Sequence, residues 1–390
     1  MKWRTMPLDT VKASVPYAFV GGPFGSNLTT RDYCEEGVPV IRGNNLPFES
    51  SFRDDNFVFV SEKKADDLRS NTAHPGDLVF TQRGTLGQVG LIPREARFQR
   101  YIISQSQMKL TVDPEVADPR FVYYFFRQLA TVQKVINHAL TSGVPHINLG
   151  ILKEFKIMLP EIDYQQRIVD ILSNYDDLIE NNRRRMALLE EAARQLYREW
   201  FVLLRFPGHE HTRMTEGVPD GWERKKLGDV LTLKRGYDLP EADRIPGDIP
   251  IVSSSGITGS HNAKKANAPG VVTGRYGTLG EVYLVDRDYW PLNTALYVSD
   301  FKGNSTGFIS HFLRHVLQGI QSDKAAVPGL NRNVAHSLTI LWPSKLLRDN
   351  FDDFTQVTNR QLSVLSAANE KLRAARDLLL PRLMNGEIAV

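Results

Sequence analysis

Two sets of polar loop residues carry side chains that could recognise a nucleic acid. Arg and Lys hold phosphates and guanine edges, Asn and Gln bind adenine edges, and Ser and Thr bind several bases. In the first half of the chain the candidates are Arg42, Asn44, Asn45, Lys63, Lys64, Gln82, Arg83 and Gln105. In the second half they are Lys234, Arg235, Ser253, Ser254, Ser255, Lys264, Lys265, Arg275, Tyr276 and Asn293.

Each of these residues also has a purely structural explanation. Polar loops are common on protein surfaces, and serines such as Ser253 to Ser255 often close turns. Asn148 and Asn331 precede short helical stretches, where we expect them to act as N-caps. Because the polar sets occur at matching places in both halves, we interpret the sets as binding surfaces, although no single residue establishes this.

Catalytic patterns are missing from the sequence. It has no Gly-x4-Gly-Lys-Ser/Thr phosphate loop, and Gly84, Gly87 and Gly90 have the wrong spacing for a dinucleotide fingerprint. Asp220 and Glu223 are too close in sequence to occupy the two adjacent strands of a nuclease metal site. The single cysteine, Cys34, excludes an internal disulfide. We therefore expect no catalytic residue and no bound metal or cofactor in this chain.

Composition narrows the class of protein further. The 390 residues are 42% hydrophobic and 24% charged, as in ordinary globular proteins of two or three domains. No apolar run is long enough to cross a membrane, and we expect a cytoplasmic protein. With a net charge of only +3, the chain, if it binds DNA, either reads it locally or relies on partners for much of the phosphate contact.

The elements that must position the polar loops are duplicated. Residues 144–204 and 327–387 correspond at a constant offset of 183, so Asn148 matches Asn331 and Pro160 matches Pro343. The preceding segments repeat more loosely, with the stretch from Arg83 resembling the stretch from Tyr276. Short apolar runs between Gly, Pro, Asn and Asp predict strands and turns in each. The order is therefore module, helix, module, helix.

Both repeated helices carry a coiled-coil pattern. From Ile168 the apolar positions advance in steps of four and three, and each helix places one asparagine, Asn182 or Asn369, in this series. If the helices pair in opposite directions about a pseudo-twofold axis near Arg184, Asn182 faces Asn369 and fixes the register. An equally acceptable interpretation leaves both asparagines on a wet edge of the pair.

We expect an α+β protein with two similar mixed α/β domains, each with a curved, mostly antiparallel sheet, separated by two long antiparallel helices. The predicted segments are a first domain at residues 1–160, a central long helix at 161–206, a second domain at 207–343 and a C-terminal long helix at 344–390.

The whole chain resembles the specificity subunit of type I restriction–modification enzymes. The first half carries the resemblance most clearly, through Pro23 to Ser26, Gly37 to Gly43, Gly76 to Gly87, Val144 to Gly150, Pro160 and Gln165 to Ile168. The second half matches more loosely, and has Arg348 and Asp349 where the family often has Glu-Gln.

The resemblance implies a non-catalytic subunit that reads a split, asymmetric sequence in double-stranded DNA. Each of two target-recognition domains reads one half-site, and the helices set the distance between the half-sites. The resemblance also implies two modification subunits, which use S-adenosylmethionine to methylate adenine, and restriction subunits that use ATP and Mg²⁺. The cofactors belong to these partners.

Four apolar residues outside the helix seam are candidates for docking the modification subunits, namely Leu188, Tyr197, Phe201 and Leu204. They could equally pack on the second module. Two other functions stay open, a DNA-modifying enzyme with an unrecognised site and a coiled-coil scaffold.

Overall fold

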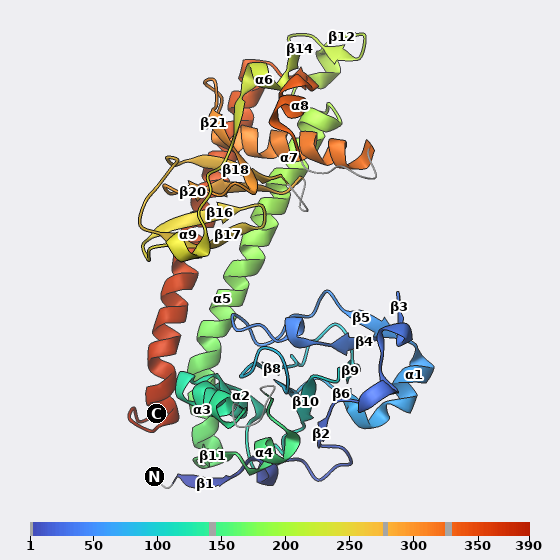
Figure 1. Ribbon diagram of the computed structural model, residues 1–390, viewed down its shortest axis with the longest axis vertical. Coiled ribbons are helices and arrows are strands. Elements are labelled where there is room, and N and C mark those ends of the chain that lie inside the picture. The colour runs from blue at the N-terminus through green and yellow to red at the C-terminus, as the bar shows by residue number, and fades with distance from the viewer. Residues whose placement is uncertain (1–2, 140–145, 276–279, 324–329) are drawn as a thin grey trace. The chain divides into compact units, whose positions relative to one another are not determined.

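The computed structural model describes residues 3–139, 146–275, 280–323 and 330–390, and its chain divides into two compact units (Figure 1). The first unit comprises Met1–Asn181 and Asn369–Val390, and the second comprises Asn182–Ala368. Both boundaries fall inside long helices, α5 (Ile162–Tyr197) and α9 (Lys345–Met384). Each unit therefore contains one globular module and a segment of both helices.

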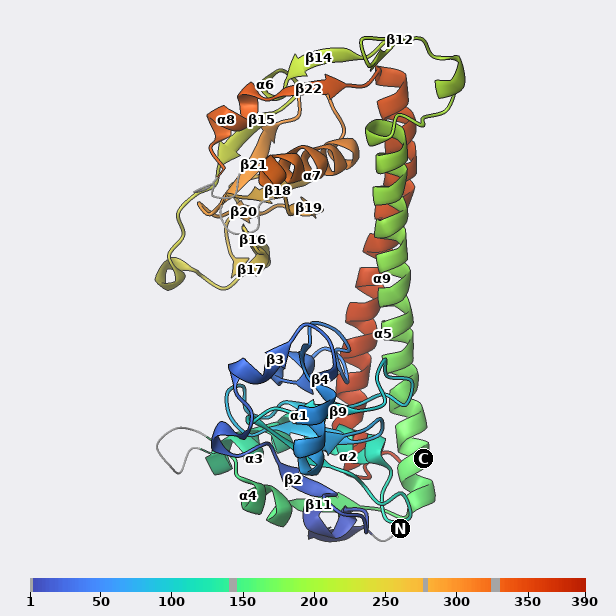
Figure 2. The ribbon, with the colours of Figure 1, turned by 90° about the vertical axis from the view of Figure 1, so that its right-hand side faces the viewer.

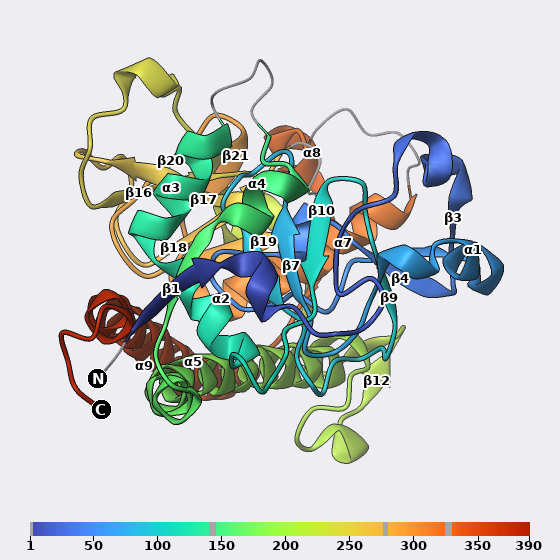
Figure 3. The same cartoon turned by 90° about the horizontal axis from the view of Figure 1, so that it is seen from below.

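The first unit is built on two main sheets. One is antiparallel, in the order β2 (Phe19–Gly21), β10 (Gln107–Leu110), β7 (Leu78–Thr81) and β8 (Val89–Leu91). The other has the order β3 (Tyr33–Cys34), β5 (Val58–Val60), β4 (Val38–Ile41), β9 (Tyr101–Ile103) and β6 (Thr72–Ala73). Only the neighbours β4 and β9 run parallel in it (Figure 3). A separate antiparallel pair joins β1 (Arg4–Pro7) to β11 (Lys156–Leu159).

The second unit repeats this arrangement. Its antiparallel sheet has the order β15 (Thr232–Arg235), β21 (Ala295–Asp300), β18 (Gly270–Gly274) and β19 (Val282–Val285). In the smaller sheet β16 (Ile249–Ser253) lies between β17 (Gly256–His261) and β20 (Trp290–Pro291), and only β16 and β20 are parallel. The other pairs are β14 (Glu223–Lys226) with β22 (Thr339–Trp342), and β12 (Met214–Thr215) with β13 (Val218–Pro219). The expected α+β fold with similar, mostly antiparallel modules is confirmed.

Short helices complete each unit. The first contains α1 (Glu62–Asp67), α2 (Pro119–Arg127), α3 (Leu129–Ala139) and α4 (Leu149–Glu154). The second contains α6 (Leu227–Val230), α7 (Thr306–Asp323) and α8 (Arg332–Ser337), and α7 packs against β18 and β19 (Figure 2). The Asn148 side chain accepts a hydrogen bond from the Ile151 amide, and that of Asn331 accepts one from the Asn333 amide. Both asparagines are therefore N-caps, as predicted.

Neither module closes its core without both long helices. In the first unit, Ile168 and Leu172 of α5 and Leu380 and Leu383 of α9 are buried in the same cluster as the module's own Phe121. In this unit the beginning of α5 lies beside the end of α9 (Figure 2). The helices therefore belong to the hydrophobic cores of the modules.

The second unit uses the other ends of the same helices. Tyr197 of α5 and Phe201 of the π-helical turn Arg198–Val202 are buried in one cluster with Leu347 and Phe351 of α9. The ring centroids of Tyr197 and Phe351 are 5.7 Å apart. For Tyr197 and Phe201 the interpretation as packing on the second module is confirmed and the docking interpretation is wrong, because aromatic rings on α7 and α9 already cover them. Leu204 packs, half-buried, against the same cluster, whereas Leu188 is 70% exposed.

The helices run in opposite directions within each unit. In the first, Asn369 donates a 3.4 Å hydrogen bond to the Ile179 carbonyl, and Arg376 contacts Asp176. The later residue of α9 therefore contacts the earlier residue of α5, as antiparallel helices require. In the second, Phe351 meets Tyr197 and Phe201 in the same register. Asn369 is buried, which excludes the wet-edge interpretation for this residue. The pairing of Asn182 with Asn369 joins residues of different units and stays a prediction.

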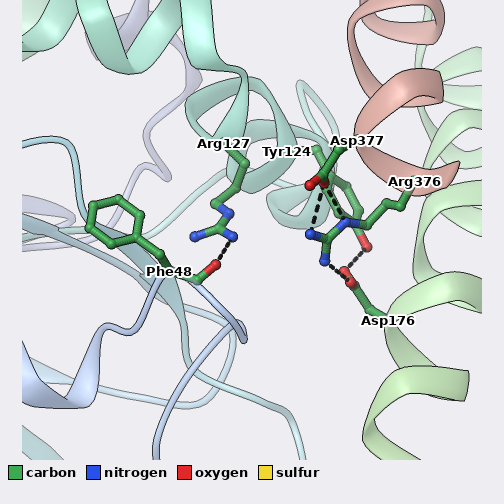
Figure 4. A network of polar contacts seen from close by, with 6 residues as sticks. All are labelled: Phe48, Tyr124, Arg127, Asp176, Arg376 and Asp377. Carbon is green, nitrogen blue, oxygen red and sulfur yellow. Dashed lines mark hydrogen bonds and ion pairs between the residues drawn. The ribbon is translucent and has the colours of Figure 1, made fainter. Parts of the chain in front are cut away.

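A polar network fastens the first module to both helices (Figure 4). The Tyr124 hydroxyl on α2 donates a 2.7 Å hydrogen bond to Asp176 on α5, whose other oxygen lies 2.5 Å from the Arg376 guanidinium on α9. Arg376 also contacts Asp377 at 2.8 Å. Burial, the largest cause, raises the pKa of Tyr124, and so does the Asp176 carboxylate, so the phenol stays a hydrogen-bond donor. Three elements distant in sequence therefore meet at one carboxylate.

The second module is fastened by aromatic packing instead. His311 of α7 stacks on the Tyr197 ring with centroids 6.0 Å apart and contacts the Phe351 ring edge-on. Burial, aided by Arg314 and Arg194, lowers the pKa of His311 to about 4. The imidazole is therefore neutral in the folded protein at neutral pH.

Replacing Asp176 by alanine should destabilise the first unit by about 1–3 kcal/mol, because the buried Tyr124 hydroxyl and one side of Arg376 lose their partner. Chemical unfolding measures this change. Asp177→Ala is the matched control, since Asp177 is the exposed neighbour on the same helix. Equal effects of the two substitutions would contradict the role given to the network.

The second unit should lose stability as the pH falls. The folded-state pKa of His311 lies below its ordinary value, so the unfolded chain takes up the proton first, and stability present above about pH 6.5 is lost towards pH 4. This residue should account for about 2 kcal/mol between pH 7.5 and pH 5. His311→Leu should flatten the pH dependence of the unfolding free energy, whereas substitution of the exposed His211 should leave it unchanged. An unaltered slope in His311→Leu would rule out this explanation.

Candidate nucleic-acid interface

Main-chain hydrogen bonds gather three polar loops at one edge of the first unit. The Ser104 amide donates to the Ile41 carbonyl (3.0 Å), which joins the turn after β9 to the end of β4. The Gln82 amide donates to the Ser106 carbonyl (2.7 Å), and the Ile147 amide donates to the Gln82 carbonyl (3.1 Å). The loops that begin at Arg42, Gln82 and Ser104 therefore form one continuous surface.

The second unit repeats this framework bond for bond. The Leu292 amide donates to the Val252 carbonyl (2.8 Å), the Arg275 amide to the Thr294 carbonyl (3.1 Å), and the Leu330 amide to the Arg275 carbonyl (2.7 Å). The loops that follow β16, β18 and β20 are thus joined in the same way as those that follow β4, β7 and β9. Different side chains are presented by the same backbone framework.

One glycine in each unit permits this close packing of loops. A Cβ atom on Gly22 would lie 2.0 Å from the Ser104 carbonyl oxygen, and one on Gly236 would lie 2.1 Å from the Leu292 carbonyl oxygen. Any larger residue would push the turn after β9 or β20 away from the sheet.

The structure separates the first-unit candidates into exposed and occupied side chains. Asn44 and Arg83 are exposed on the joined loops, while Arg42 and Gln82 are half-buried there, and Arg42 donates to the Asn56 carbonyl. Gln105 is occupied by the carbonyls of Gly25 and Leu28. Lys63 and Lys64 lie on a separate element, α1, where Lys64 pairs with Asp32 at 3.0 Å.

Asn45 requires a correction. Its side chain is completely buried, donates to the carbonyls of Arg53 and Asp55, and accepts from the Arg42 amide. All of these bonds fix the loop after β4, so Asn45 is a structural residue and does not face a ligand. A Cβ atom on the neighbouring Gly43 would lie 3.5 Å from the side-chain oxygen of Gln88, a residue that was not among the sequence candidates.

Several second-unit candidates also have internal partners. Ser253 is buried and bonds to Ser255 and to the Gly256 carbonyl, so its role is to close the turn between β16 and β17. Lys264 pairs with Asp288 at 2.5 Å, and Asn293 donates to Asp238. Arg275 donates to the Asn293 carbonyl at 3.2 Å, and Ser254 is half-buried. Arg235 is exposed, and Tyr276 lies outside the described residues.

Two lysines of the second unit converge on aromatic rings. The Lys265 ammonium lies 5.5 Å from the centre of the Tyr237 ring and 5.1 Å from that of Trp290. The Lys234 ammonium lies 5.5 Å from the same Tyr237 ring and donates a 3.2 Å hydrogen bond to its hydroxyl. Tyr237 and Trp290 were missed by the sequence analysis, although aromatic residues interleaved with lysines are a known signal for nucleic-acid surfaces.

The electrostatics of this cluster favour an anion. The hydrogen bond with Tyr297 and then the Lys234 ammonium lower the pKa of the Tyr237 phenol. Both lysines are exposed, so their charges face solvent above a partly apolar floor. Such a surface suits a DNA phosphate together with the sugar or base beside it.

Two other kinds of site have no candidate in the part of the chain that the structure describes. Within the described ranges, no group of three His, Cys, Asp or Glu side chains is placed to hold a metal ion. None of the helices described there is long and apolar enough to span a membrane.

Comparison with known proteins identifies the family. The family model described as the type I restriction modification DNA specificity domain matches residues 29–191 and again residues 219–334. The chain belongs to this DNA specificity family. The two matches fall on the two modules, which explains why the loop framework occurs twice.

Two curated members of the family are similar over most of their length. The MjaIX specificity subunit of Methanocaldococcus jannaschii is 24% identical over 364 residues, which cover 85% of this chain and 82% of the relative. The HindI specificity subunit of Haemophilus influenzae is 21% identical over 403 residues, with 80% and 86% covered.

A solved structure supports the fold. The S subunit of the type I restriction–modification system from M. genitalium superposes with a TM-score of 0.56 at 18% identity, covering 98% of this chain and 96% of that one.

Lys265→Ala should weaken DNA binding and lower the slope of log affinity against log salt by about one, because one phosphate contact is lost. Binding isotherms at several salt concentrations measure both. Lys264→Ala is the matched control, since this neighbouring lysine is already paired with Asp288. If both substitutions have the same small effect, the cluster is not part of the interface.

Proposed function

We propose that this chain is the DNA-recognition subunit of a type I restriction–modification system and reads a bipartite, asymmetric sequence. The observation that carries the proposal is the duplicated loop framework, in which equivalent hydrogen bonds hold different side chains. One module offers Arg42, Asn44, Gln82 and Arg83, and the other offers Lys234, Arg235, Tyr237 and Lys265. Because their donors and acceptors differ, the modules prefer different half-sites.

The proposal places the chemistry on other chains. Two modification subunits with S-adenosylmethionine methylate adenine after flipping it out of the duplex. Restriction subunits with ATP and Mg²⁺ translocate and cut DNA, and this chain binds none of these cofactors. Family membership supports this division of labour. The complex acts in the cytoplasm, on DNA that enters the cell.

The long helices set the spacing between half-sites in this proposal. In this proposal the DNA-recognition domains are residues 1–160 and 207–343. The helices that separate them are residues 161–206 and 344–390. The pairing of Asn182 with Asn369 fixes the register of these helices. Leu188, exposed on α5, is the remaining member of the docking set suggested for the modification subunits.

Selection from random duplexes tests the function. The chain loaded with its modification subunits is incubated with the pool, and the bound DNA is sequenced. A split motif with a fixed gap is expected. A pool without such a motif would favour a scaffold protein, and methylation or cleavage by the chain alone would show it to be an enzyme.

Arg83→Ala should reduce enrichment at one half-site and leave the other unchanged, because Arg83 is exposed on the loop after β7. A lost arginine–guanine contact costs about 1–3 kcal/mol of discrimination. The same selection experiment measures it, with Arg94→Ala as a control at another exposed arginine of the first unit. Equal loss at both halves would make Arg83 a phosphate-binding or structural residue.

A further inference from the structure

The first unit contains a cleft that its own residues do not fill. It has a volume of about 890 Å³ and is lined by α2, α3 and the last turns of α9. Its apolar lining includes Tyr123, Leu129, Met158 and Leu380. Charged side chains of both signs also line it, namely Arg127, Lys134, Lys156, Arg373, Arg376, Glu49, Asp176 and Asp377. Arg127 donates a hydrogen bond to the Phe48 carbonyl (Figure 4).

The internal repeat shows what occupies the equivalent place in the second unit. At the offset of 183, Leu380 corresponds to Tyr197 and Arg373 to Glu190. On the short helices, Tyr124 and Arg127 of α2 correspond to His311 and Arg314 of α7. The two units can therefore be compared residue by residue at this position.

An aromatic ring fills the space in the second unit. The Tyr197 ring lies within 6.0 Å of His311, 6.1 Å of His315 and 5.7 Å of Phe351, measured between centroids. In the first unit, the smaller aliphatic Leu380 stands in place of Tyr197, and Gln128 stands in place of His315. The loss of ring volume leaves part of the cleft open.

The charges at this position are exchanged between the two units, because Arg373 stands in place of Glu190 and Asp377 stands in place of Arg194. In the second unit burial and then the Arg194 guanidinium lower the pKa of Arg314, whereas the Glu281 and Glu190 carboxylates favour its charged form. In the first unit three guanidinium groups line the cleft, those of Arg127, Arg373 and Arg376, and Arg376 is paired with Asp176 and Asp377. The Arg373 Nε atom is buried and has no hydrogen-bond partner within the described residues. A buried N–H of this kind calls for an acceptor.

We propose that the cleft docks a segment of a modification subunit that carries an aromatic side chain next to carboxylates. The aromatic ring takes the place that Tyr197 fills in the second unit, and a carboxylate pairs with Arg127 or Arg373. This inference rests on the proposed function. Because Tyr197 fills the equivalent place in the second unit, only one of the two modification subunits uses this contact.

The lining favours a protein segment over DNA. Leu129 is 87% exposed and Phe48 is 41% exposed at the cleft. Burial of these exposed apolar side chains against an apolar partner is favourable. Phosphates gain nothing from such side chains. Carboxylates beside an aromatic ring satisfy both the cationic and the apolar parts of the cleft.

Calorimetric titration of the full chain with purified modification subunit tests the inference. The variants are Leu129→Asp and Lys134→Glu, which change exposed positions on α3 and leave the core intact. Each should weaken one of two binding events at least tenfold and leave the other unchanged. Leu378→Asp and Lys371→Glu are controls, because both are exposed on α9 and neither lines the cleft.

The possible outcomes separate the two proposals. If the unmodified chain binds no modification subunit, the proposed function fails. If it binds two and both cleft variants bind two with unchanged affinity, the docking cleft is wrong while the function stands. If Lys134→Glu instead weakens DNA binding of the chain alone, the cleft is a DNA surface and the inference is overturned.

Discussion

The sharing of each hydrophobic core between distant helix segments is the constraint on which the rest of the structure depends. The first module buries Leu380 and Leu383, and the second buries Tyr197 and Phe201, each from the end of a long helix. A helix of about 40 residues is about 60 Å long. It gains little stability from its own hydrogen bonds, and most comes from the apolar faces that it packs. Helix pairing and module folding are therefore a single event in each unit.

This constraint explains how near-identical frameworks can present different surfaces. The backbone bonds that join Ile41 to Ser104 and Val252 to Leu292 are the same, so the loops are held wherever their side chains point. Substitution at an exposed position such as Arg83 leaves those bonds intact. Substitution at Gly22 or Gly236 does not, because the added Cβ would meet a carbonyl oxygen. Recognition can thus vary while the fold is kept.

The sequence predicted the repeated features well and the individual contacts poorly. The offset of 183 predicted duplicated modules, and the spacing of Ile168, Leu172 and Ile179 predicted paired helices. Both worked because the spacing of apolar residues indicates directly which face of a helix is buried. Burial of Asn45 could not be predicted, since it depends on carbonyls of Arg53 and Asp55 that only the folded loop brings near. Tyr197 and Phe201 resembled a docking surface because the helix pattern does not reveal which module covers its end.

We propose that the helix pair sets the distance between the two half-sites that the modules read. The direct measurement is the gap in the selected DNA motif after removal of one heptad from each helix, residues 183–189 and the facing residues 362–368. Seven residues shorten a helix by about 10 Å, which corresponds to about three base pairs at 3.4 Å each. We expect a gap shorter by about three base pairs with the same bases at both half-sites. A folded deletion variant that selects the original gap would contradict it.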